Sequence, residues 1–378
     1  MFSLNSKISL AKSTLFQNTP VYVQFYITAR CNLTCEQCNI IYANSDVREC
    51  SLYEIEKIAE NLAQIGVAIV LLTGGEPFAR KDLSEIIYAF EKRGIHTRMQ
   101  TNGFATEKEI EKCIKAGGKD ISISLDSLKP DMQDKINGGF DRSWHKALET
   151  ISLFTKYLDP KNSFASLGCV FQKKNLYEVE KVIKFGTNIG WFTSLVPIHI
   201  TNQINPRGFR TFDKSLKFSH EQYLMIDNVI EKIKDMKKEG YLLYDSDEYL
   251  DNIKLFTQNK DITWRRKNNN VCDSPNLYFA ILPNGEFAPC CDFRLNNSYP
   301  IYSDEFKKNF KSLNFKEEVD TITKNCEGCM YGSYPEISIS MRFMKAKIQR
   351  IGNFFTSPPK RNWPLNYKDL LEISKMTN

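Results

Sequence analysis

Several features are missing from this 378-residue chain. No apolar run approaches the ~20 residues that a helix needs to cross a bilayer. The N-terminal stretch 1–20 is polar and lacks the continuous apolar segment of a secretory signal. The net charge is also low, because 51 Lys and Arg against 45 Asp and Glu leave a formal charge of only +6. These absences predict a cytoplasmic protein with no transmembrane segment and no nucleic-acid partner.

Histidine is scarce as well, with four residues, whereas cysteine occurs eleven times. In a reducing compartment, clustered thiols more often bind metal or carry redox chemistry than form disulfides. A hydrophobic content of 42% with 25% charged residues is ordinary for a globular chain. The length predicts one large domain and a smaller one.

The first cysteine cluster is Cys31-Asn32-Leu33-Thr34-Cys35-Glu36-Gln37-Cys38, which directly follows a strand-like apolar run over 21–27. Three thiolates bind three irons of a [4Fe-4S] cluster and leave the fourth iron open to another ligand, unless a distant cysteine supplies that ligand. From the spacing alone, a zinc knuckle or three unrelated thiols are the alternatives.

This C-x3-C-x2-C spacing resembles the signature of the radical S-adenosylmethionine (radical SAM) superfamily, which lies in the loop after the first barrel strand. The resemblance implies that Cys31, Cys35 and Cys38 hold the catalytic [4Fe-4S] cluster and that its open iron chelates SAM. It also implies reductive cleavage of SAM to a 5′-deoxyadenosyl radical, which abstracts hydrogen from the substrate. The family usually has an aromatic residue before the third cysteine, and this chain has Gln37 there.

Strand-like and helix-like stretches alternate after this loop, as in β/α units with a parallel sheet. The predicted strands are 21–28, 68–72, 97–101, 120–125, 164–171 and 192–197. Four capping-box patterns predict where helices begin: Ser51 with Glu54, Asp82 with Glu85, Thr106 with Glu109, and Asn175 with Glu178. Six such units match the partial (β/α)6 TIM-like barrel of radical SAM enzymes, whose chemistry lies at the C-terminal ends of the strands.

A SAM site is predicted at these strand ends. Gly74-Gly75-Glu76-Pro77 resembles the family's GGEP motif, in which glycines let the backbone approach a ligand and a carboxylate can hold an ammonium group. Period-2 alternation places Ser122, Ser124 and Asp126 on one face of the fourth strand. The resemblance assigns SAM binding to Gly74, Gly75, Glu76, Pro77, Asn102, Ser124 and Asp126. The alternatives are a simple turn at the GGEP segment and local backbone contacts for the serine and aspartate.

Two further residues are candidates for catalysis. Cys169 lies in the fifth predicted strand, where its thiol could donate a hydrogen atom inside the barrel, and His199 ends the sixth, where it could touch substrate. A small buried hydrophobe and a structural histidine are the alternative interpretations. Cys50 and Cys113 have no partner spacing and are predicted to be buried.

A second cysteine system consists of Cys272, Cys290, Cys326 and Cys329. It resembles the Twitch domain, a shortened SPASM domain, in which the first pair flanks a β-hairpin, here over 278–282 and 287–289. The resemblance implies that these four residues fully ligate an auxiliary [4Fe-4S] cluster. A structural zinc with four thiolates is the alternative, and Cys291 has no assignment.

The predicted domains are a radical SAM core over 1–200, a helical linker over 201–270, an α+β iron–sulfur domain over 271–332 and a basic tail over 333–378. Within the tail, 337–355 is predicted as one basic amphipathic helix. We expect this helix to dock against the barrel. Contact with a membrane surface or an acidic partner is the alternative.

The expected function is that of an oxidoreductase-type radical SAM enzyme that takes hydrogen from a small-molecule substrate, for net oxidation in a biosynthetic pathway. An electron donor such as flavodoxin or ferredoxin is implied. Peptide maturases of this type often carry an N-terminal recognition domain, and only about twenty residues precede the first strand here, which favours the small molecule. The alternatives are a peptide- or protein-modifying maturase and, third, a non-enzymatic iron–sulfur electron carrier.

Overall fold

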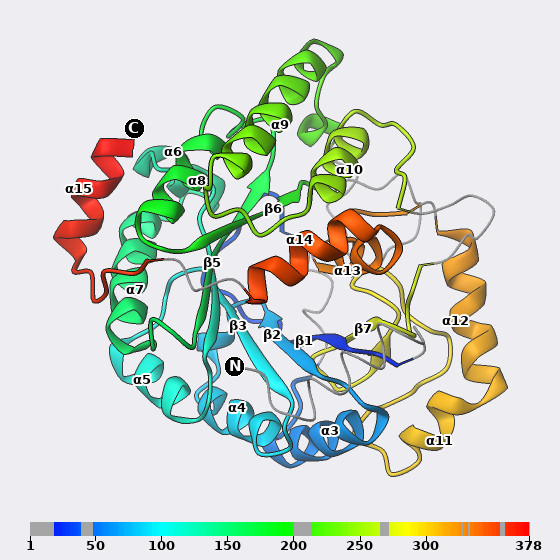
Figure 1. The fold of residues 1–378 in the computed structure, drawn as a ribbon. Coiled ribbons are helices and arrows are strands. Elements are labelled where there is room, and N and C mark those ends of the chain that lie inside the picture. The colour runs from blue at the N-terminus through cyan, green and yellow to red at the C-terminus, as the bar shows by residue number, and fades with distance from the viewer. Residues whose placement is uncertain are drawn as a thin grey trace.

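The computed structural model of the protein describes residues 19–38, 48–199, 214–264, 272–326, 328–331, 333–355 and 360–377. The predicted linker therefore lies partly outside the described residues, at 201–213 and 265–270. Within the described ranges, no helix is long and apolar enough to span a membrane. Figure 1 shows a curved sheet wrapped by a ring of helices.

The sheet has the strand order β6-β5-β4-β3-β2-β1-β7-β8. Its strands are β1 (Tyr22–Thr28), β2 (Ile69–Gly74), β3 (His96–Thr101), β4 (Asp120–Ser124), β5 (Phe164–Phe171), β6 (Phe192–Pro197), β7 (Tyr278–Ile281) and β8 (Phe287–Ala288). Strands β1 to β6 pair in parallel in chain order. The six predicted barrel strands are confirmed, with ends that differ by no more than two residues.

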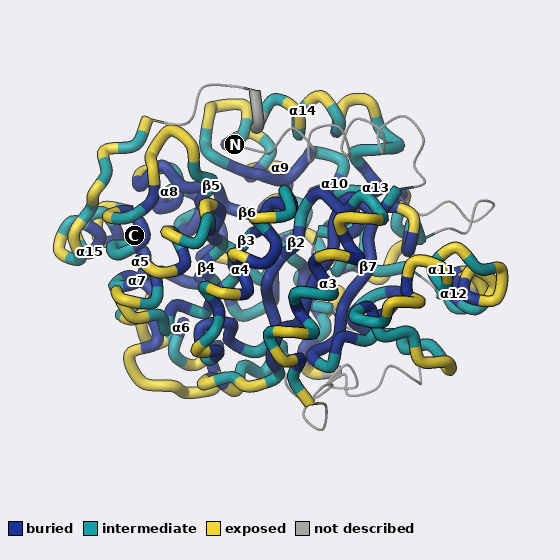
Figure 2. The backbone as a smooth tube through the Cα atoms, turned by 90° about the horizontal axis from the view of Figure 1, so that it is seen from below, coloured by how far each residue is buried: buried dark blue, intermediate teal, exposed yellow. Residues whose placement is uncertain are grey.

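The helices of the first half cover the outer face of this sheet (Figure 1). They are α3 (Leu52–Ile65), α4 (Leu83–Glu91), α5 (Glu107–Lys115), α6 (Pro130–Ile136), α7 (Ser143–Tyr157) and α8 (Val179–Asn188), with a short 3-10 helix η1 (Pro77–Ala79). Alternate side chains of each strand point to opposite faces of the sheet. On β1, Val23 and Phe25 join the apolar core between the sheet and the helices, whereas Tyr22 and Gln24 face the inside of the barrel. In Figure 2 the strands are buried and the exposed positions gather on the outer helices.

Two of the four predicted capping boxes are confirmed, those of Ser51 before α3 and Thr106 before α5. The helix start predicted at Asp82 is confirmed, because Asp82 is the N-cap residue of α4, but its capping box does not form, since its carboxylate pairs with the guanidinium of Arg80. The prediction for Asn175 is wrong, since α8 begins only at Val179. The Asn175 amide instead donates to the backbone carbonyls of Asp126 and Val170. A short polar side chain caps a helix only when no stronger hydrogen-bond or ion-pair partner competes for it.

The predicted C-terminal hairpin exists as β7 and β8, which pair antiparallel. It does not form a sheet of its own, because β7 pairs in parallel with β1, in the register of Tyr22 with Tyr278. The iron–sulfur segment is therefore continuous with the barrel sheet. Side chains of both parts share apolar clusters, one of which joins Tyr22, Leu277 and Tyr334.

The second half of the chain adds further helices. They are η2 (Lys214–Leu216), η3 (His220–Gln222), α9 (Tyr223–Lys238), α10 (Asp247–Thr257), α11 (Phe306–Lys311), α12 (Leu313–Asn325), α13 (Ser333–Arg342), α14 (Met344–Phe355) and α15 (Tyr367–Thr377). Of these, α15 packs outside α7 and α8, and α11 lies against α3 (Figure 1). The single helix predicted over 337–355 is wrong: α13 ends at Arg342 and α14 begins at Met344. Docking against the barrel is confirmed, since Glu336 of α13 accepts hydrogen bonds from Ser246 and Arg350 of α14 binds Tyr244.

Candidate functional site

A cavity of about 310 Å³ fills the inside of the barrel. Inward positions on β4, β5 and β6 carry small residues, among them Ser122, Ser166, Gly168 and Ser194, which leave this space open. The predicted site residues that line the cavity are Cys31, Cys35, Cys38, Gly74, Gly75, Pro77, Asn102, Ser124, Asp126, Cys169 and His199. The fold thus brings together residues from five strand ends, as the barrel topology predicts.

The three thiols of the first cluster sit in the loop that leaves β1. The backbone turns tightly between them, with the Cys38 amide donating to the Cys35 carbonyl over 3.1 Å. Burial raises the pKa of the Cys31 and Cys35 thiols, and the neighbouring thiols add to this. Thiols in such a site ionise when a cation binds them, which is the chemistry of metal-ligating cysteines.

The three thiols line one cavity, and three thiolates are the ligand set that the family resemblance assigns to a [4Fe-4S] cluster. Zinc bound by thiolates remains the alternative for these residues.

The GGEP segment lies against the base of the cysteine loop. The amides of Gly75 and Glu76 donate to the carbonyls of Thr28 and Arg30, each over 2.8 Å. A Cβ atom on Gly74 would lie 2.2 Å from the Thr28 oxygen, and one on Gly75 2.2 Å from the Arg30 oxygen. Only glycine allows the two strand ends to approach this closely.

Glu76 itself is buried behind the cavity wall and does not line the cavity. Its carboxylate accepts hydrogen bonds from the Phe78 amide, the Thr101 hydroxyl and the Asn102 amide, at 2.9, 2.9 and 2.7 Å. Burial raises its pKa to about 7. In this structure Glu76 ties the end of β2 to the end of β3, and its contact with SAM stays a prediction.

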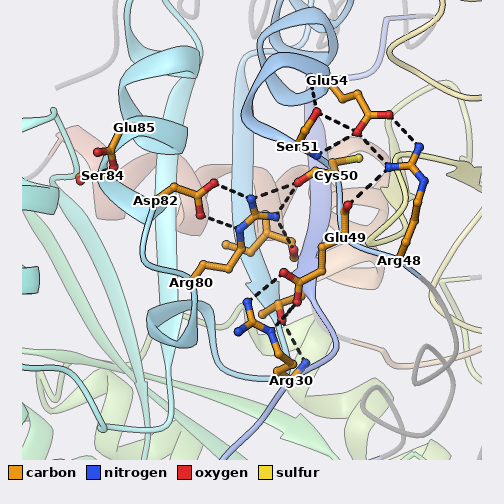
Figure 3. A network of polar contacts seen from close by, with 12 residues as sticks. Arg30, Arg48, Glu49, Cys50, Ser51, Glu54, Arg80, Asp82, Ser84 and Glu85 are labelled. Atoms are coloured by element: carbon orange, nitrogen blue, oxygen red, sulfur yellow. Dashed lines mark hydrogen bonds and ion pairs between the residues drawn. The ribbon is translucent and has the colours of Figure 1, made fainter.

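The buried side chain of Arg80 holds together the backbone segments around the cysteine loop and the GGEP segment. Arg80 donates to the carbonyls of Ile27 and Cys50, at 3.1 Å each, and to Asp82 at 2.6 Å. Figure 3 shows this guanidinium between Cys50 and Asp82, with the exposed pair Arg48–Glu54 nearby. Arg80 therefore connects the end of β1, the segment before α3 and the turn after GGEP.

The polar residues on β3 and β4 surround the same thiols. The side-chain nitrogen Nδ2 of Asn102 donates to Asn32 Oδ1 over 2.9 Å and lies 3.6 Å from Cys31 Sγ. Asp126 accepts from the Val170 amide over 2.6 Å and from Gln37 Nε2 over 3.4 Å. Burial raises the pKa of Asp126 to about 7. Gln37, the departure from the usual aromatic residue, thus contacts a predicted SAM ligand.

The second set of thiols lines a smaller cavity of about 30 Å³, at the side of the barrel where β7 joins β1. Its lining includes Cys272, Cys290, Cys326 and Cys329. Burial raises the pKa of Cys272 to about 12 and that of Cys329 above its ordinary value. Cys291 is also buried but does not line this cavity. The structure therefore brings the four predicted ligands together and leaves Cys291 outside.

His199 lines both cavities. Its Nε2 lies 3.1 Å from Asp292 Oδ2, and its ring stacks on Phe256 and meets Tyr331 edge-on. Cys169 lines the larger cavity near Asn175, whose amide lies 3.7 Å from the thiol. Cys50 and Cys113 are buried, as predicted.

The floor of the large cavity was not predicted. It is formed at the N-terminal ends of the strands by Arg98, Tyr244, Asp245, Glu336 and Arg350. The Tyr244 ring lies between the two guanidiniums, 5.4 Å from that of Arg98 and 3.8 Å from that of Arg350. Only the inward-facing position of Arg98 on β3 could have indicated part of this floor, because the other four residues come from two segments, 244–245 and 336–350, that are far from β3 in the sequence.

Comparison with known proteins gives one family match: residues 25–186 fit the model of the Radical SAM superfamily. A PqqA peptide cyclase of Bradyrhizobium diazoefficiens is 28% identical over 172 residues, which cover 45% of this chain and 44% of the relative. A GTP 3′,8-cyclase of Haemophilus ducreyi is 32% identical over 152 residues, covering 36% and 45%. The chain thus aligns with somewhat less than half the length of these curated relatives.

Solved structures resemble a larger part of the chain. SuiB of Streptococcus suis bound to its precursor peptide SuiA has a TM-score of 0.61 at 16% identity and covers 86% of this chain and 76% of its own. The enzyme anSMEcpe with bound AdoMet and the Cp18Cys peptide has a TM-score of 0.57 at 16% identity, covering 95% and 100%. At 16% identity the similarity to these structures shows the fold alone. The structural similarity covers more of the chain than residues 25–186, which match the family model, and includes the C-terminal segment.

Proposed function

Because residues 25–186 make this chain a member of the radical SAM superfamily, we propose that it abstracts a hydrogen atom from a side chain of a peptide or protein. A [4Fe-4S] cluster and SAM are the cofactors of the family, and when bound here they would supply the electron and the radical for this step. Small iron–sulfur or flavin proteins of the ferredoxin and flavodoxin type are the proposed electron donors. The arrangement that carries the proposal is the single cavity lined by all three clustered thiols and by the GGEP glycines.

Each part of this cavity has a distinct role. Cys31, Cys35 and Cys38 are the proposed cluster ligands. The cavity-lining backbone of Gly74 and Gly75 would offer carbonyl oxygens to the SAM ammonium, while Glu76 holds the segment in place from behind. Asn102, Ser124 and Asp126 present polar groups to the remainder of SAM. The enclosing barrel excludes water from a reactive radical.

We further propose that Cys272, Cys290, Cys326 and Cys329 hold an auxiliary [4Fe-4S] cluster. The shared cavity and the resemblance of this cysteine pattern to a Twitch domain support the proposal, and a structural zinc with four thiolates is the alternative. A cluster held by these four thiolates would leave no iron open to substrate. It would supply an acceptor for the electron of the substrate radical, so that the net reaction would be an oxidation.

The peptide substrate is supported by the names of similar proteins. PqqA peptide cyclase is among the relatives in sequence, and SuiB and anSMEcpe have structures with bound peptides. The fold likeness to these two covers the barrel and the C-terminal segment together. A small-molecule substrate is the second candidate, supported by the higher identity of the barrel to GTP 3′,8-cyclase.

The test is release of 5′-deoxyadenosine, measured by LC–MS on the reconstituted, reduced protein with SAM. The reaction is run alone, with the peptide fraction and with the small-metabolite fraction of a host extract. Stimulation by peptides supports the proposal, and stimulation by metabolites alone reverses the choice of substrate. Cys35→Ala should abolish release, while Cys113→Ala, a buried thiol outside both cavities, should retain it. Release that survives Cys35→Ala contradicts the assignment of the catalytic cluster.

The auxiliary site is tested by composition. Iron, sulfide and zinc are measured in the reconstituted protein and in Cys272→Ala, with Cys113→Ala as the control. We expect iron and sulfide to fall by about half in Cys272→Ala, since one of two clusters is lost. Zinc that is present in the unsubstituted protein and lost in Cys272→Ala, with iron unchanged, contradicts the auxiliary cluster.

A further inference from the structure

Two layers of side chains line the inside of the barrel below the level of Asn102 and Ser124. The register of β3, β4 and β5 places three residues side by side in the upper layer: Gln100, Ser122 and Ser166. The register of β1, β2 and β3 gives the lower layer: Gln24, Leu71 and Arg98. A strand advances about 7 Å over two residues, so the layers lie about 7 and 13 Å below Asn102. Bulky branched side chains usually fill such layers, so packing does not explain this polar lining.

Both glutamines present one end of their amide to the cavity. Gln100 Oε1 accepts a hydrogen bond from the Thr73 hydroxyl over 3.1 Å, and Gln24 Oε1 accepts one from the Tyr26 hydroxyl over 3.3 Å. Among the residues that the structure describes, the Nε2 atom of neither glutamine has a hydrogen-bond partner. Gln24 is only 6% exposed, and buried polar groups of this kind are normally hydrogen-bonded. These two amide ends are therefore available to a bound molecule.

Arg98 brings a guanidinium to the bottom of the same space. Its Cζ lies 4.5 Å from the centre of the Phe164 ring and 5.4 Å from that of Tyr244, so two aromatic rings hold it. The group has five N–H donors, yet within the described ranges it makes one hydrogen bond, of 3.5 Å to the Tyr244 hydroxyl. Asp120 Oδ2 lies 3.6 Å from Arg98 Nε, beyond hydrogen-bond distance, and 2.8 Å from His96 Nε2. Arg98 therefore retains donors for a further acceptor.

The other charged groups of the floor have partners inside the protein. Arg350 Nε lies 3.6 Å from Glu336 Oε1, which balances the charge of both. Asp245 accepts hydrogen bonds from the Ser194 hydroxyl and the Leu195 amide, at 2.8 and 2.6 Å. The two layers therefore offer hydrogen-bond donors that lack an acceptor, and the balance of charge around them is close to even.

We propose that Gln24, Arg98 and Gln100 select a substrate side chain that ends in a planar group with acceptor oxygens, a carboxamide or a carboxylate. Given the proposed peptide substrate, on which this selection rests, the group belongs to one of its side chains. Amide and guanidinium donors form paired, coplanar hydrogen bonds with such groups. An apolar side chain in the same space would leave these buried donors without acceptors, which weakens its binding.

The test measures binding rather than turnover. The probes are four blocked amino acids, the N-acetyl methylamides of glutamine, glutamate, leucine and lysine. Saturation-transfer NMR on the full reconstituted chain, with and without SAM, gives the affinity of each probe. We expect the glutamine or the glutamate probe to bind at least about tenfold more tightly than the leucine and lysine probes, because only their side chains supply acceptor oxygens. The tighter of the two assigns the carboxamide or the carboxylate.

A substitution of the upper layer should change the selectivity. Gln100→Leu should weaken binding of the polar probe about tenfold and strengthen binding of the leucine probe, whereas a general loss of structure would weaken all probes alike. Gln64→Leu, at an exposed position of α3, is the matched control and should bind the probes like the unsubstituted protein. If circular dichroism shows that Gln100→Leu is unfolded, Gln24→Leu replaces it, with the same expected change.

Four outcomes overturn the proposal. They are no binding of either polar probe, equally tight binding of the leucine or lysine probe, displacement of the polar probe by SAM, and unchanged selectivity in the folded variant. Displacement by SAM would assign the two layers to the cofactor instead. The proposed function fails on a different measurement, when no peptide stimulates release of 5′-deoxyadenosine, so the two failures can be told apart.

Discussion

Asn137 Oδ1 lies 3.6 Å from the Sγ of Cys35, although 102 residues separate the two in sequence. The orientation of this amide is fixed by its other end. Asn137 Nδ2 donates to Ser143 Oγ over 2.9 Å, and the Ser143 hydroxyl donates onward to Asp134 Oδ1 over 2.7 Å. The amide oxygen is therefore the atom that faces the thiol. A ligating thiolate at Cys35 meets an acceptor rather than a donor.

This contact predicts that Asn137→Ala raises the reduction potential of the catalytic cluster. Reduction adds negative charge to the cluster, and an acceptor oxygen beside one ligand opposes it. A change of hydrogen-bond size, about 0.5–1.5 kcal/mol, corresponds to roughly 20–60 mV for one electron. The potential is measured by an EPR-monitored titration of the reconstituted protein. Ser143→Ala, which frees the amide to rotate, should shift the potential in the same direction, and no shift in either variant contradicts the prediction.

Gly75→Ala should weaken SAM binding by at least about tenfold. The added Cβ would lie 2.2 Å from the Arg30 carbonyl oxygen, so the GGEP segment must move away from the cysteine loop. A backbone clash of this kind costs about 1–3 kcal/mol, and 1.4 kcal/mol is a factor of ten. Calorimetric titration of SAM into the reconstituted protein measures the effect. Gly352→Ala is the matched control, because a Cβ there meets nothing within 4 Å, and its affinity should equal that of the unsubstituted protein.

Arg80→Ala should lower the free energy of unfolding by roughly 2–4 kcal/mol, as judged by chemical denaturation of the apoprotein. The substitution leaves the carbonyls of Ile27 and Cys50 and the carboxylate of Asp82 without their donor. Arg48→Ala, which removes a largely exposed guanidinium from Glu54, should cost less than about 1 kcal/mol. If the two substitutions lowered the free energy of unfolding equally, the contacts of Arg80 with Ile27, Cys50 and Asp82 would not stabilise the fold as proposed.

The pH dependence of stability should change in Glu336→Gln. Burial raises the pKa of Glu336 to about 7, above its ordinary value, so the folded state holds this proton more tightly than the unfolded chain. The contribution of Glu336 to the free energy of unfolding therefore falls as pH rises from about 4.5 to about 7. Relative to the unsubstituted protein, Glu336→Gln should gain roughly 2 kcal/mol between pH 5 and pH 8.

Denaturation of the apoprotein at a series of pH values measures this gain. Glu60→Gln, on the exposed side of α3, is the control and should parallel the unsubstituted protein. A constant difference between Glu336→Gln and the unsubstituted protein at all pH values would contradict the raised pKa.

The barrel and its cysteine loop were predictable because their signals are local. Strand periodicity, the capping boxes of Ser51 and Thr106, and the spacing of Cys31, Cys35 and Cys38 each span fewer than about ten residues. Such patterns also gave the inward face of β4 correctly, since Ser122, Ser124 and Asp126 all line the cavity. The prediction that all four second-set cysteines lie together rested on a family resemblance, and the structure places them around one small cavity.

The failures involve competition between partners. Asp82 had the sequence of a capping box, but the charge of the nearby Arg80 is a stronger partner than backbone amides. The helix predicted over 337–355 had a continuous apolar period, yet Gln349 and Arg350 decide its orientation through contacts with Asp247 and Tyr244, more than 100 residues away. No local pattern contains these two distant partners, so sequence alone could not rank them.

The pairing of β7 with β1 has a consequence for synthesis of the chain. The edge of β1 that faces away from β2 receives its partner only after the ribosome has passed Tyr278. Until then the nascent barrel presents an unpaired, largely apolar strand beside its cysteine loop, and exposed strand edges of this kind pair with other chains. Pairing of β7 with β1 therefore covers the exposed edge of the first strand. We expect the nascent chain to be less prone to aggregation once β7 has been synthesised and has paired.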